Sequence, residues 1–511
     1  MTRHLTLTVF LAGLTTLAVE FIASRLLQTV YGSSNLVWAN VIGLVLLALS
    51  AGYYLGGRWA DQDPRPERFY ALICLAAYSA VVALLLAGLW VRPAAAALAA
   101  ANLGAIGGTL AASALILVAP VTLLGAITPF AIRLSVNDIS RAGRISGRLY
   151  AVSTCGSLAG AYLPVLVAIP LAGTRWSSLI FGLPLYLVGW WGALRFGARW
   201  ARWLWLPLAL LIPLVWLATR GPLKATPGLI EARESAYNYI EVIQSGPCRH
   251  LRLNEGVGIH SIHCPDGDLP PEMVWSLLVA APFYNPTPRV ERLAIVGLAG
   301  GTVARLYGQV WPSLHIDGFE VDPAIVSVGR TYFDLNRPDL SVLVGDGRYW
   351  LNQQREPYDV VILDAYRVPY IPWHLTTQEF FGEVRRRLTE TGVLAVNVGR
   401  TPTDRRLVEA LTATLLTVFP TVHTLDAPGS LNTVLTATAQ PTDARALRAA
   451  LSAAEMPWLR AVLSVAVANQ QPTVAHPPVF RDDRAPVETL VDSLVIRYLL
   501  TTGLGGLLDP P

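Results

Sequence analysis

The stretch Leu293-Ala-Ile-Val-Gly297-Leu-Ala-Gly300-Gly301 joins an apolar, strand-like run to a glycine-rich turn. Further apolar strand-like runs follow at residues 314–321, 342–344, 358–363 and 393–398, with helical stretches between them. Strands that alternate with helices predict a mostly parallel sheet covered by helices on both faces, as in Rossmann-like folds. Such sheets bind ligands at the carboxyl ends of their strands, so the residues that follow each run are the first candidates for a site.

Glycines and acids follow the first three of these runs. Glu320 ends the second run roughly 20 residues after the first glycine, the offset at which a carboxylate receives the ribose hydroxyls of a bound nucleotide. Asp346 lies in a turn after the third run and is placed to accept a hydrogen bond from an adenine amine, although such a turn also forms without a ligand. The candidate nucleotide-binding residues are Gly297, Gly300, Gly301, Glu320, Asp322, Asp346 and Gly347.

Asp364 follows the fourth run, at the position where an acid faces the substrate in these folds. A carboxylate there can accept a proton from an attacking amine, which makes Asp364 the candidate catalytic residue. The next residues form an aromatic, proline-stiffened segment, which either closes over an acceptor molecule or only connects two elements. Tyr366, Arg367 and His374 are the candidate acceptor contacts in this segment.

Residues 221–290 contain short alternating strands separated by turn residues, which predicts a small antiparallel β-region ahead of the large sheet. Its two cysteines, Cys248 and Cys264, show no zinc-ligand spacing, and His260 and His263 would face opposite sides of a strand. No metal site is therefore expected. A disulfide between the cysteines is expected only if this part of the chain lies outside the cytoplasm.

Residues 1–220 consist of long apolar segments, each near the ~20 residues that a helix needs to cross a bilayer. They explain why 53% of the chain is hydrophobic and why its mean hydropathy is +0.45. The pI near 8.9 averages a basic membrane half and an acidic second half, so it does not indicate nucleic-acid binding. About seven candidate spans are expected, at residues 5–24, 36–57, 69–91, 103–132, 149–171, 176–194 and 202–218.

The chain is thus expected to comprise a transmembrane helical domain (1–220), the β-region (221–290) and a Rossmann-like domain (291–511). Arginines cluster after the second, fourth and sixth spans, which places those loops and the N-terminus in the cytoplasm. Seven crossings would then put residues 221–511 outside, away from the usual supply of adenosyl nucleotides. Because the span at 202–218 is short, interrupted by prolines and rich in tryptophan, we expect it to be interfacial or re-entrant. The expected location is a multi-pass cell-membrane protein with a cytoplasmic second half.

The motifs of the second half resemble those of the spermidine synthase (polyamine aminopropyltransferase) family. They occur in the order Glu234-Ser-Ala-Tyr237-Asn238, Gly297 to Gly301, Glu320-Val-Asp322-Pro, Gly345-Asp346-Gly347 and Tyr358 to Asp364. The first half resembles the membrane-fused members of this family through Glu20, Ser24-Arg25, Gly52-Tyr53, Gly56-Gly57-Arg58, Asp61 and the segment Tyr150 to Ser157. The resemblance implies an S-adenosyl-type nucleotide held by Glu320 and Asp346, an amine oriented or deprotonated by Asp364, and substrate contacts from Tyr237 and Asn238. It also implies that the chain self-associates as a homo-oligomer.

The sequence departs from the family in acids that attract a cationic polyamine. Gly300 and Arg367 replace two of them, and the segment around Ser276 replaces a Tyr-His-Glu motif. A positive charge near Asp364 disfavours a dication, so the donor and the acceptor both stay open.

Aminopropyl transfer from decarboxylated S-adenosylmethionine is the first hypothesis. The second is methyl transfer from S-adenosylmethionine to a hydrophobic or lipid-linked acceptor. The third is a non-catalytic transporter or sensor that binds a nucleotide. The expected partners are a small-molecule or lipid-linked acceptor and the bilayer, with neither nucleic acid nor metal.

Overall fold

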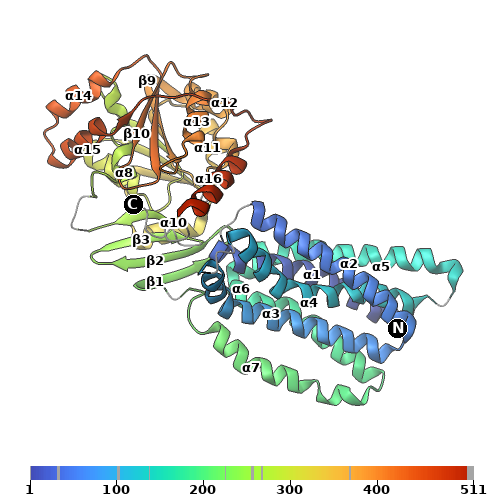
Figure 1. The fold of residues 1–511 in the computed structure, drawn as a ribbon. Coiled ribbons are helices and arrows are strands. Elements are labelled where there is room, and N and C mark those ends of the chain that lie inside the picture. The colour runs from blue at the N-terminus through green and yellow to red at the C-terminus, as the bar shows by residue number, and fades with distance from the viewer. Residues whose placement is uncertain are drawn as a thin grey trace. The chain divides into compact units, whose positions relative to one another are not determined.

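The computed structural model describes residues 2–31, 35–100, 104–136, 138–224, 226–254, 258–265, 269–366 and 370–502. Two compact units divide the chain (Figure 1). The helical unit comprises Met1–Ala225 and Glu234–Tyr239, and the α/β unit comprises Thr226–Arg233 and Ile240–Pro511. The division lies close to the expected boundary at residue 220, but the β-region does not separate from the Rossmann-like part.

The helical unit contains seven α-helices within the described residues. They are α1 (Thr2–Tyr31), α2 (Asn35–Gln62), α3 (Pro66–Ala100), α4 (Gly104–Ser135), α5 (Ala142–Leu163), α6 (Ile169–Arg195) and α7 (Trp205–Thr219), with short η1 (Ile139–Arg141), η2 (Pro164–Ala168) and η3 (Arg199–Trp203) between them. By length and composition, six stretches of the described chain could cross a membrane. The fifth stretch, Ile139–Arg195, is 57 residues long and contains both the fifth and the sixth predicted spans.

A backbone break at Gly173 divides that long stretch. Its φ of 82° and ψ of 165° are not helical, and only glycine adopts this conformation readily. Thr174, just after the break, donates its backbone N–H to the Glu234 carboxylate at 3.1 Å. The chain therefore turns back at Gly173, inside the stretch labelled α6, and the helix that follows this residue runs in a different direction from α5.

Contacts between the helices fix their directions. Gly156 lies against the Phe10 carbonyl and Gly160 against that of Leu14, so α5 runs parallel to α1. The His4 and Trp191 rings are 4.5 Å apart, whereas the Thr15 hydroxyl donates to the Phe181 carbonyl, so α6 runs antiparallel to α1. We call the end of the unit marked by His4, Tyr70 and Trp191 the His4 end, and the end marked by Arg25, Gly173 and Gly221 the Arg25 end.

Helix α7 lies lengthwise beside α3 and α6 (Figure 1). Near its start, the Tyr186 hydroxyl donates to the Leu204 carbonyl at 2.8 Å. Just beyond its end, Arg175 donates to the Gly221 carbonyl at 3.0 Å. The helix thus runs from the His4 end to the Arg25 end, alongside α3 and α6. Leu211 and Ala218 bury their side chains against α3, and this packing outweighs the two prolines.

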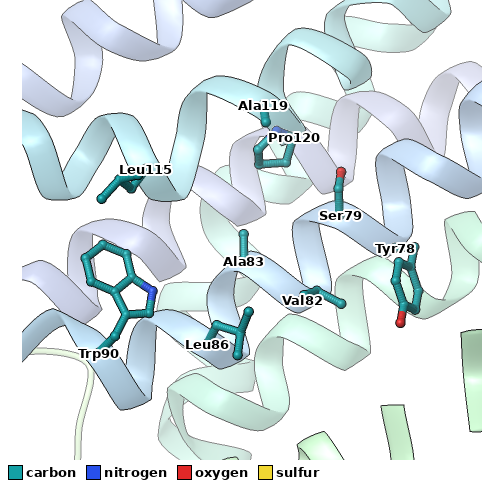
Figure 2. A pocket seen from close by; sticks show the side chains of 9 residues that line it. All are labelled: Tyr78, Ser79, Val82, Ala83, Leu86, Trp90, Leu115, Ala119 and Pro120. Carbon is teal, nitrogen blue, oxygen red and sulfur yellow. The ribbon is translucent and has the colours of Figure 1, made fainter. Parts of the chain in front are cut away.

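Glycines let α2 and α4 approach closely. A Cβ on Gly52 would lie 2.2 Å from the Thr122 carbonyl oxygen, and one on Gly56 would lie 2.4 Å from that of Ala126. Small residues spaced four apart allow such backbone contact between membrane helices. Beside this contact, an open groove of about 440 Å³ lies between α3 and α4, with Tyr78 and Trp90 at opposite ends (Figure 2). Its lining is almost entirely apolar.

The α/β unit contains two sheets. The smaller has the order β1-β2-β3-β4, formed by β1 (Leu229–Glu234), β2 (Tyr239–Ser245), β3 (Cys248–Leu253) and β4 (Ile259–His263). The pairs β2–β3 and β3–β4 are antiparallel, as the sequence predicted. A disulfide joins Cys248 to Cys264 at one end of the β3–β4 ladder.

The larger sheet has the order β12-β10-β11-β9-β8-β5-β6-β7. Its strands are β5 (Arg292–Val296), β6 (His315–Glu320), β7 (Leu340–Val344), β8 (Tyr358–Leu363), β9 (Leu388–Gly399), β10 (Thr421–Asp426), β11 (Asn432–Thr438) and β12 (Gln470–Gln471). The five strands from β7 to β9 are parallel, as predicted, whereas β11, β10 and β12 form an antiparallel edge that the sequence did not indicate. The helices are α8 (Val274–Leu278), α9 (Thr302–Val310), α10 (Pro323–Tyr332), α11 (Gly347–Gln353), α12 (Gln378–Arg387), α13 (Arg406–Leu415), α14 (Ala444–Ala453), α15 (Pro457–Ala468) and α16 (Val487–Thr502), with short η4 (Ala281–Tyr284) and η5 (Trp373–Leu375).

The small sheet packs on the α10 region through its own apolar face. Ile240, Val242 and Leu251 form a buried cluster with Ile325 and Phe333 of the α10 region. Strand β4 is also hydrogen-bonded to the start of α9. This shared core explains why the β-region does not form a separate unit.

Candidate functional site

Gly297 and Asp364 lie side by side at the carboxyl edge of the large sheet. They follow β5 and β8, which are adjacent parallel strands on either side of the point where the strand order reverses. The Asp364 backbone N–H donates to the Val296 carbonyl at 2.9 Å. A Cβ on Gly297 would lie 2.5 Å from the Asp364 carbonyl oxygen, and the φ of Gly297 is +91°. Glycine is required here so that the two strand ends can meet at the crevice where such sheets bind ligands.

The remaining predicted glycines pack against protein. Gly300 is buried, and its backbone N–H donates to the Ser261 hydroxyl of β4 at 2.8 Å. A Cβ on Gly301 would lie 2.4 Å from Leu335, and one on Gly347 would lie 2.6 Å from Val296. Gly300 and Gly301 therefore pack the glycine loop against other parts of the protein, and Gly347 packs the start of α11 against β5.

Glu320 ends β6 and points its carboxylate at the glycine loop. One oxygen accepts the backbone N–H of Ala299 at 2.9 Å, and the other accepts that of Asp322 at 3.1 Å. Burial raises the pKa of Glu320 to about 7, despite these hydrogen bonds. Each carboxylate oxygen keeps a lone pair that can accept a further donor.

Asp322 has a structural role. Its side chain is fully buried, and it caps helix α10 by accepting the backbone N–H of Ala324 at 2.9 Å. That Asp322 also binds the cofactor stays a prediction.

Asp346 and His374 form a pair at the edge of the site. One Asp346 oxygen lies 2.9 Å from the His374 imidazole Nε2, and the other caps α11 through the backbone N–H of Tyr349. The hydrogen bond from His374 is the main reason why the pKa of Asp346 falls below its usual value. Next to this pair and to Glu320, the side chains of Val344 and Val321 are 44% and 42% exposed. Acids and exposed apolar side chains thus alternate along this edge.

The Asp364 carboxylate is held by two uncharged donors. The Trp275 indole N–H donates to one oxygen at 3.0 Å, and the Asn397 amide donates to the other at 2.8 Å. Loss of hydration inside the site raises the pKa of Asp364 to about 6, although both hydrogen bonds favour the charged form. An acid with this pKa is largely ionised at neutral pH and still takes up a proton readily.

Asn397 connects Asp364 to other parts of the sheet. Its own amide oxygen accepts from Asn432 at 2.9 Å, and its backbone carbonyl accepts the Tyr366 hydroxyl at 3.0 Å. Sequence reasoning missed Trp275, Asn397 and Asn432 as site residues. The signal for Asn397 was available, because it is the one polar residue in the apolar run Val393–Val398 of the strand next to Asp364.

The predicted acceptor contacts are distributed over both units. Tyr366 lies beside Asp364 as expected, and His374 is committed to Asp346. Tyr237 and Asn238 belong to the helical unit, where Arg25 donates to the Tyr237 carbonyl at 2.9 Å. Arg367 lies outside the described residues. Among the described residues, no group of three or more His, Cys, Asp or Glu side chains is arranged to hold a metal ion.

Comparison of the chain with known protein families gives a match. The spermine/spermidine synthase domain family matches residues 284–428. This stretch includes β5 to β9 and the acids Glu320, Asp322, Asp346 and Asp364. Within the α/β unit, this matched stretch is a spermidine synthase-like domain. This confirms the predicted class and, with it, the expectation that the chain is a transferase.

Similar proteins include aminopropyltransferases and a methyltransferase. A probable polyamine aminopropyl transferase of Bifidobacterium longum is 29% identical over 304 residues, which is 54% of this chain and 67% of that protein. A polyamine aminopropyltransferase of Vibrio vulnificus is 29% identical over 208 residues, or 39% of this chain and 68% of that protein. The human eEF1A lysine and N-terminal methyltransferase is 28% identical over 156 residues, or 28% of this chain and 22% of that protein.

Proposed function

We propose that this chain is a membrane-attached aminopropyltransferase that uses decarboxylated S-adenosylmethionine and an amine acceptor. The observation that carries the proposal is the position of Asp364. Its carboxylate accepts two hydrogen bonds and follows a strand end that meets the glycine loop, and the same loop donates to Glu320. The similarity to polyamine aminopropyltransferases supports the reaction class. The six apolar stretches support attachment to a bilayer.

The residues at the sheet edge fit an adenosyl nucleotide. The ribose hydroxyls can donate to the remaining lone pairs of Glu320, and Asp346 can accept an adenine amine. Val321 and Val344 offer exposed apolar side chains between these acids, suited to the faces of a purine.

The reaction requires the protein mainly to align the amine with the donor and to accept a proton. The lone pair of a neutral amine forms the new C–N bond, the C–S bond of the donor breaks, and its electron pair stays on sulfur as a neutral thioether. Asp364 accepts the proton that the attacking nitrogen releases. Trp275 and Asn397 keep the carboxylate oriented and ionised for this step.

Methyl transfer from S-adenosylmethionine is the second proposal. Gly300 in place of an acid removes a negative charge that would repel the carboxylate of this donor. The similarity to a protein methyltransferase supports it. The same Asp364 can accept a proton from a nucleophile in either reaction, so the donor decides between them. The acceptor of a methyltransferase would be hydrophobic or lipid-linked.

The deciding experiment titrates the detergent-purified full-length protein with each donor separately, by calorimetry. Tighter binding of the decarboxylated donor, followed by turnover with a polyamine, supports aminopropyl transfer. Tighter binding of intact S-adenosylmethionine favours methyl transfer, and binding of both without turnover favours a sensor or transporter.

Two variants connect the result to the site. Asp364→Asn is expected to keep donor binding and to lower kcat by about 10²–10⁴-fold, the usual contribution of a general base. Glu320→Gln is expected to weaken donor binding. Asp339→Asn is the control, because Asp339 precedes β7 and pairs with Arg337 outside the site. Full activity of Asp364→Asn would exclude the proposed role.

A further inference from the structure

We infer that the α/β unit lies on the extracytoplasmic side of the membrane, opposite to the side expected from the sequence. The inference does not rest on the proposed reaction. It rests on where the chain leaves the helical unit, on the distribution of arginines over its two ends, and on the disulfide.

The first observation is the path of the chain. Helices α1, α3, α5 and α7 run from the His4 end to the Arg25 end, and α2, α4 and α6 run back, as the contacts between them require. Residues Glu234–Tyr239 belong to the helical unit, and its Arg25 and Thr174 side chains bind them. Residue 240 onward therefore continues from the Arg25 end, whereas the N-terminus lies at the His4 end.

The second observation is the charge at the two ends. The arginines in or next to the connections at the His4 end are Arg3, Arg58, Arg65, Arg68, Arg133, Arg141, Arg144, Arg148, Arg195, Arg199 and Arg202. Those towards the Arg25 end are Arg25, Arg92, Arg175 and Arg220. Short connections rich in Arg stay in the cytoplasm, so the His4 end faces the cytoplasm and the Arg25 end faces away from it.

Two of the arginines at the Arg25 end also have structural partners. Arg25 donates to the carbonyls of Ser235 and Tyr237, and Arg175 donates to those of Gly221 and Pro222. These contacts account for their presence without a cytoplasmic location. The asymmetry between the two ends is therefore larger than the numbers of arginines alone suggest.

The third observation is the Cys248–Cys264 disulfide. Disulfides persist in oxidising compartments and are rare where the thiol pool of the cytoplasm keeps cysteines reduced. The two remaining cysteines, Cys74 and Cys155, lie in the membrane helices and are free. The paired cysteines are thus found only in the unit that the first two observations place outside.

The location has a consequence for substrate supply. An S-adenosyl nucleotide carries a sulfonium charge and polar groups, and charged groups cross lipid only at high cost. If the proposed function also holds, a carrier-mediated export step must deliver the donor to this side.

The test labels single cysteines in intact cells or spheroplasts with a membrane-impermeant maleimide. In a Cys74→Ala, Cys155→Ala background, Ser452→Cys reports the α/β unit through an exposed position of α14. Ile139→Cys, at a side chain that is 89% exposed, reports the connection between α4 and α5 at the His4 end. We expect labelling of Ser452→Cys in intact cells and of Ile139→Cys only in inverted vesicles.

The opposite labelling pattern would overturn the inference. A second measurement counts thiols after alkylation in the living cell: Cys248 and Cys264 should accept a maleimide polymer only after reduction. If both are alkylated before reduction, the unit resides in a reducing compartment and the inference fails. Neither readout depends on activity, so failure of the proposed reaction would leave both results interpretable.

Discussion

The Trp275 indole N–H donates a hydrogen bond to the Asp364 carboxylate across 3.0 Å, although 89 residues separate them in the sequence. This bond favours the charged form of a carboxylate whose pKa is raised to about 6 by the surrounding protein. Trp275 is therefore a positioning residue for the proposed proton transfer, and its effect should appear in a pH profile.

Turnover should fall tenfold per pH unit as the pH drops below about 6, because Asp364 then holds a proton and cannot accept another. Trp275→Phe removes a hydrogen bond that lowers the Asp364 pKa, so this acid limb should move to higher pH. Trp458→Phe is the matched control, because that buried indole donates to the Leu269 carbonyl and does not contact Asp364. Steady-state rates between pH 5 and 8 measure the shift; an unmoved limb in Trp275→Phe would contradict the role.

Donor affinity should depend on pH through Glu320. Its pKa of about 7 lies above the ordinary 4.5, so the folded free protein retains this proton over a range where an exposed glutamate is ionised. Ribose hydroxyls donate to the ionised carboxylate, and affinity should therefore decrease as the pH falls below about 7. Calorimetric titrations at pH 5.5, 7 and 8.5 measure this. Glu320→Gln should bind weakly and with little pH dependence, and a wild-type affinity that is constant over the range would exclude the contact.

The raised pKa of Glu320 also makes the stability of the fold depend on pH. Because the folded state binds the Glu320 proton more tightly than the unfolded state, this group stabilises the ligand-free fold below pH 4.5 and loses that contribution as the pH rises through 7. The unfolding temperature of wild type relative to Glu320→Gln should decrease over this window. An increase would contradict the assignment.

The disulfide should support the nucleotide site as well as the fold. It closes a 16-residue separation, for which loop closure predicts about 3 kcal/mol of stabilisation. Cys264 directly follows β4, whose Ser261 and Ile262 are hydrogen-bonded to Gly300 and Thr302. The Cys248→Ser, Cys264→Ser variant should unfold at lower temperature and bind the donor more weakly. A reductant should reproduce both effects in wild type and change nothing in the variant.

Close packing of α2 on α4 predicts a position-specific effect of one methyl group. In Gly52→Ala the new Cβ would lie 2.2 Å from the Thr122 carbonyl, so the helices must separate and the thermal unfolding temperature should decrease. Gly57→Ala is the control, since its Cβ would meet nothing within 4 Å and alanine favours the helix by about 1 kcal/mol. Equal effects of the two substitutions would contradict the packing.

The sequence predicted the acids at the sheet edge because parallel strands place their carboxyl ends together. Glu320, Asp346 and Asp364 needed only the strand order to be recognised. Trp275 could not be predicted, because a hydrogen bond between distant segments depends on how α8 packs over the sheet. The helix cap formed by Asp322 was not predicted, although Asp followed by Pro323 is a usual start of a helix.

The helical unit was likewise predictable from the sequence only in part. Apolar length alone located the helices, whereas the path of α7 depends on partners at both of its ends, Tyr186 and Arg175, which hydropathy does not report. The antiparallel strands β10 and β11 were equally hidden. They lie between helical segments, in the same alternation of strands and helices as the parallel part of the sheet.

Gly173 gives the long stretch from Ile139 to Arg195 an even number of passes. If this residue were helical, one continuous rod would replace the α5–α6 hairpin, and every element after it would emerge in the other compartment. A side chain at this position would have to adopt a φ of 82° that favours glycine, at a cost of order 1–3 kcal/mol. In the proposed topology, a single residue without a side chain therefore decides on which side of the membrane the α/β unit emerges.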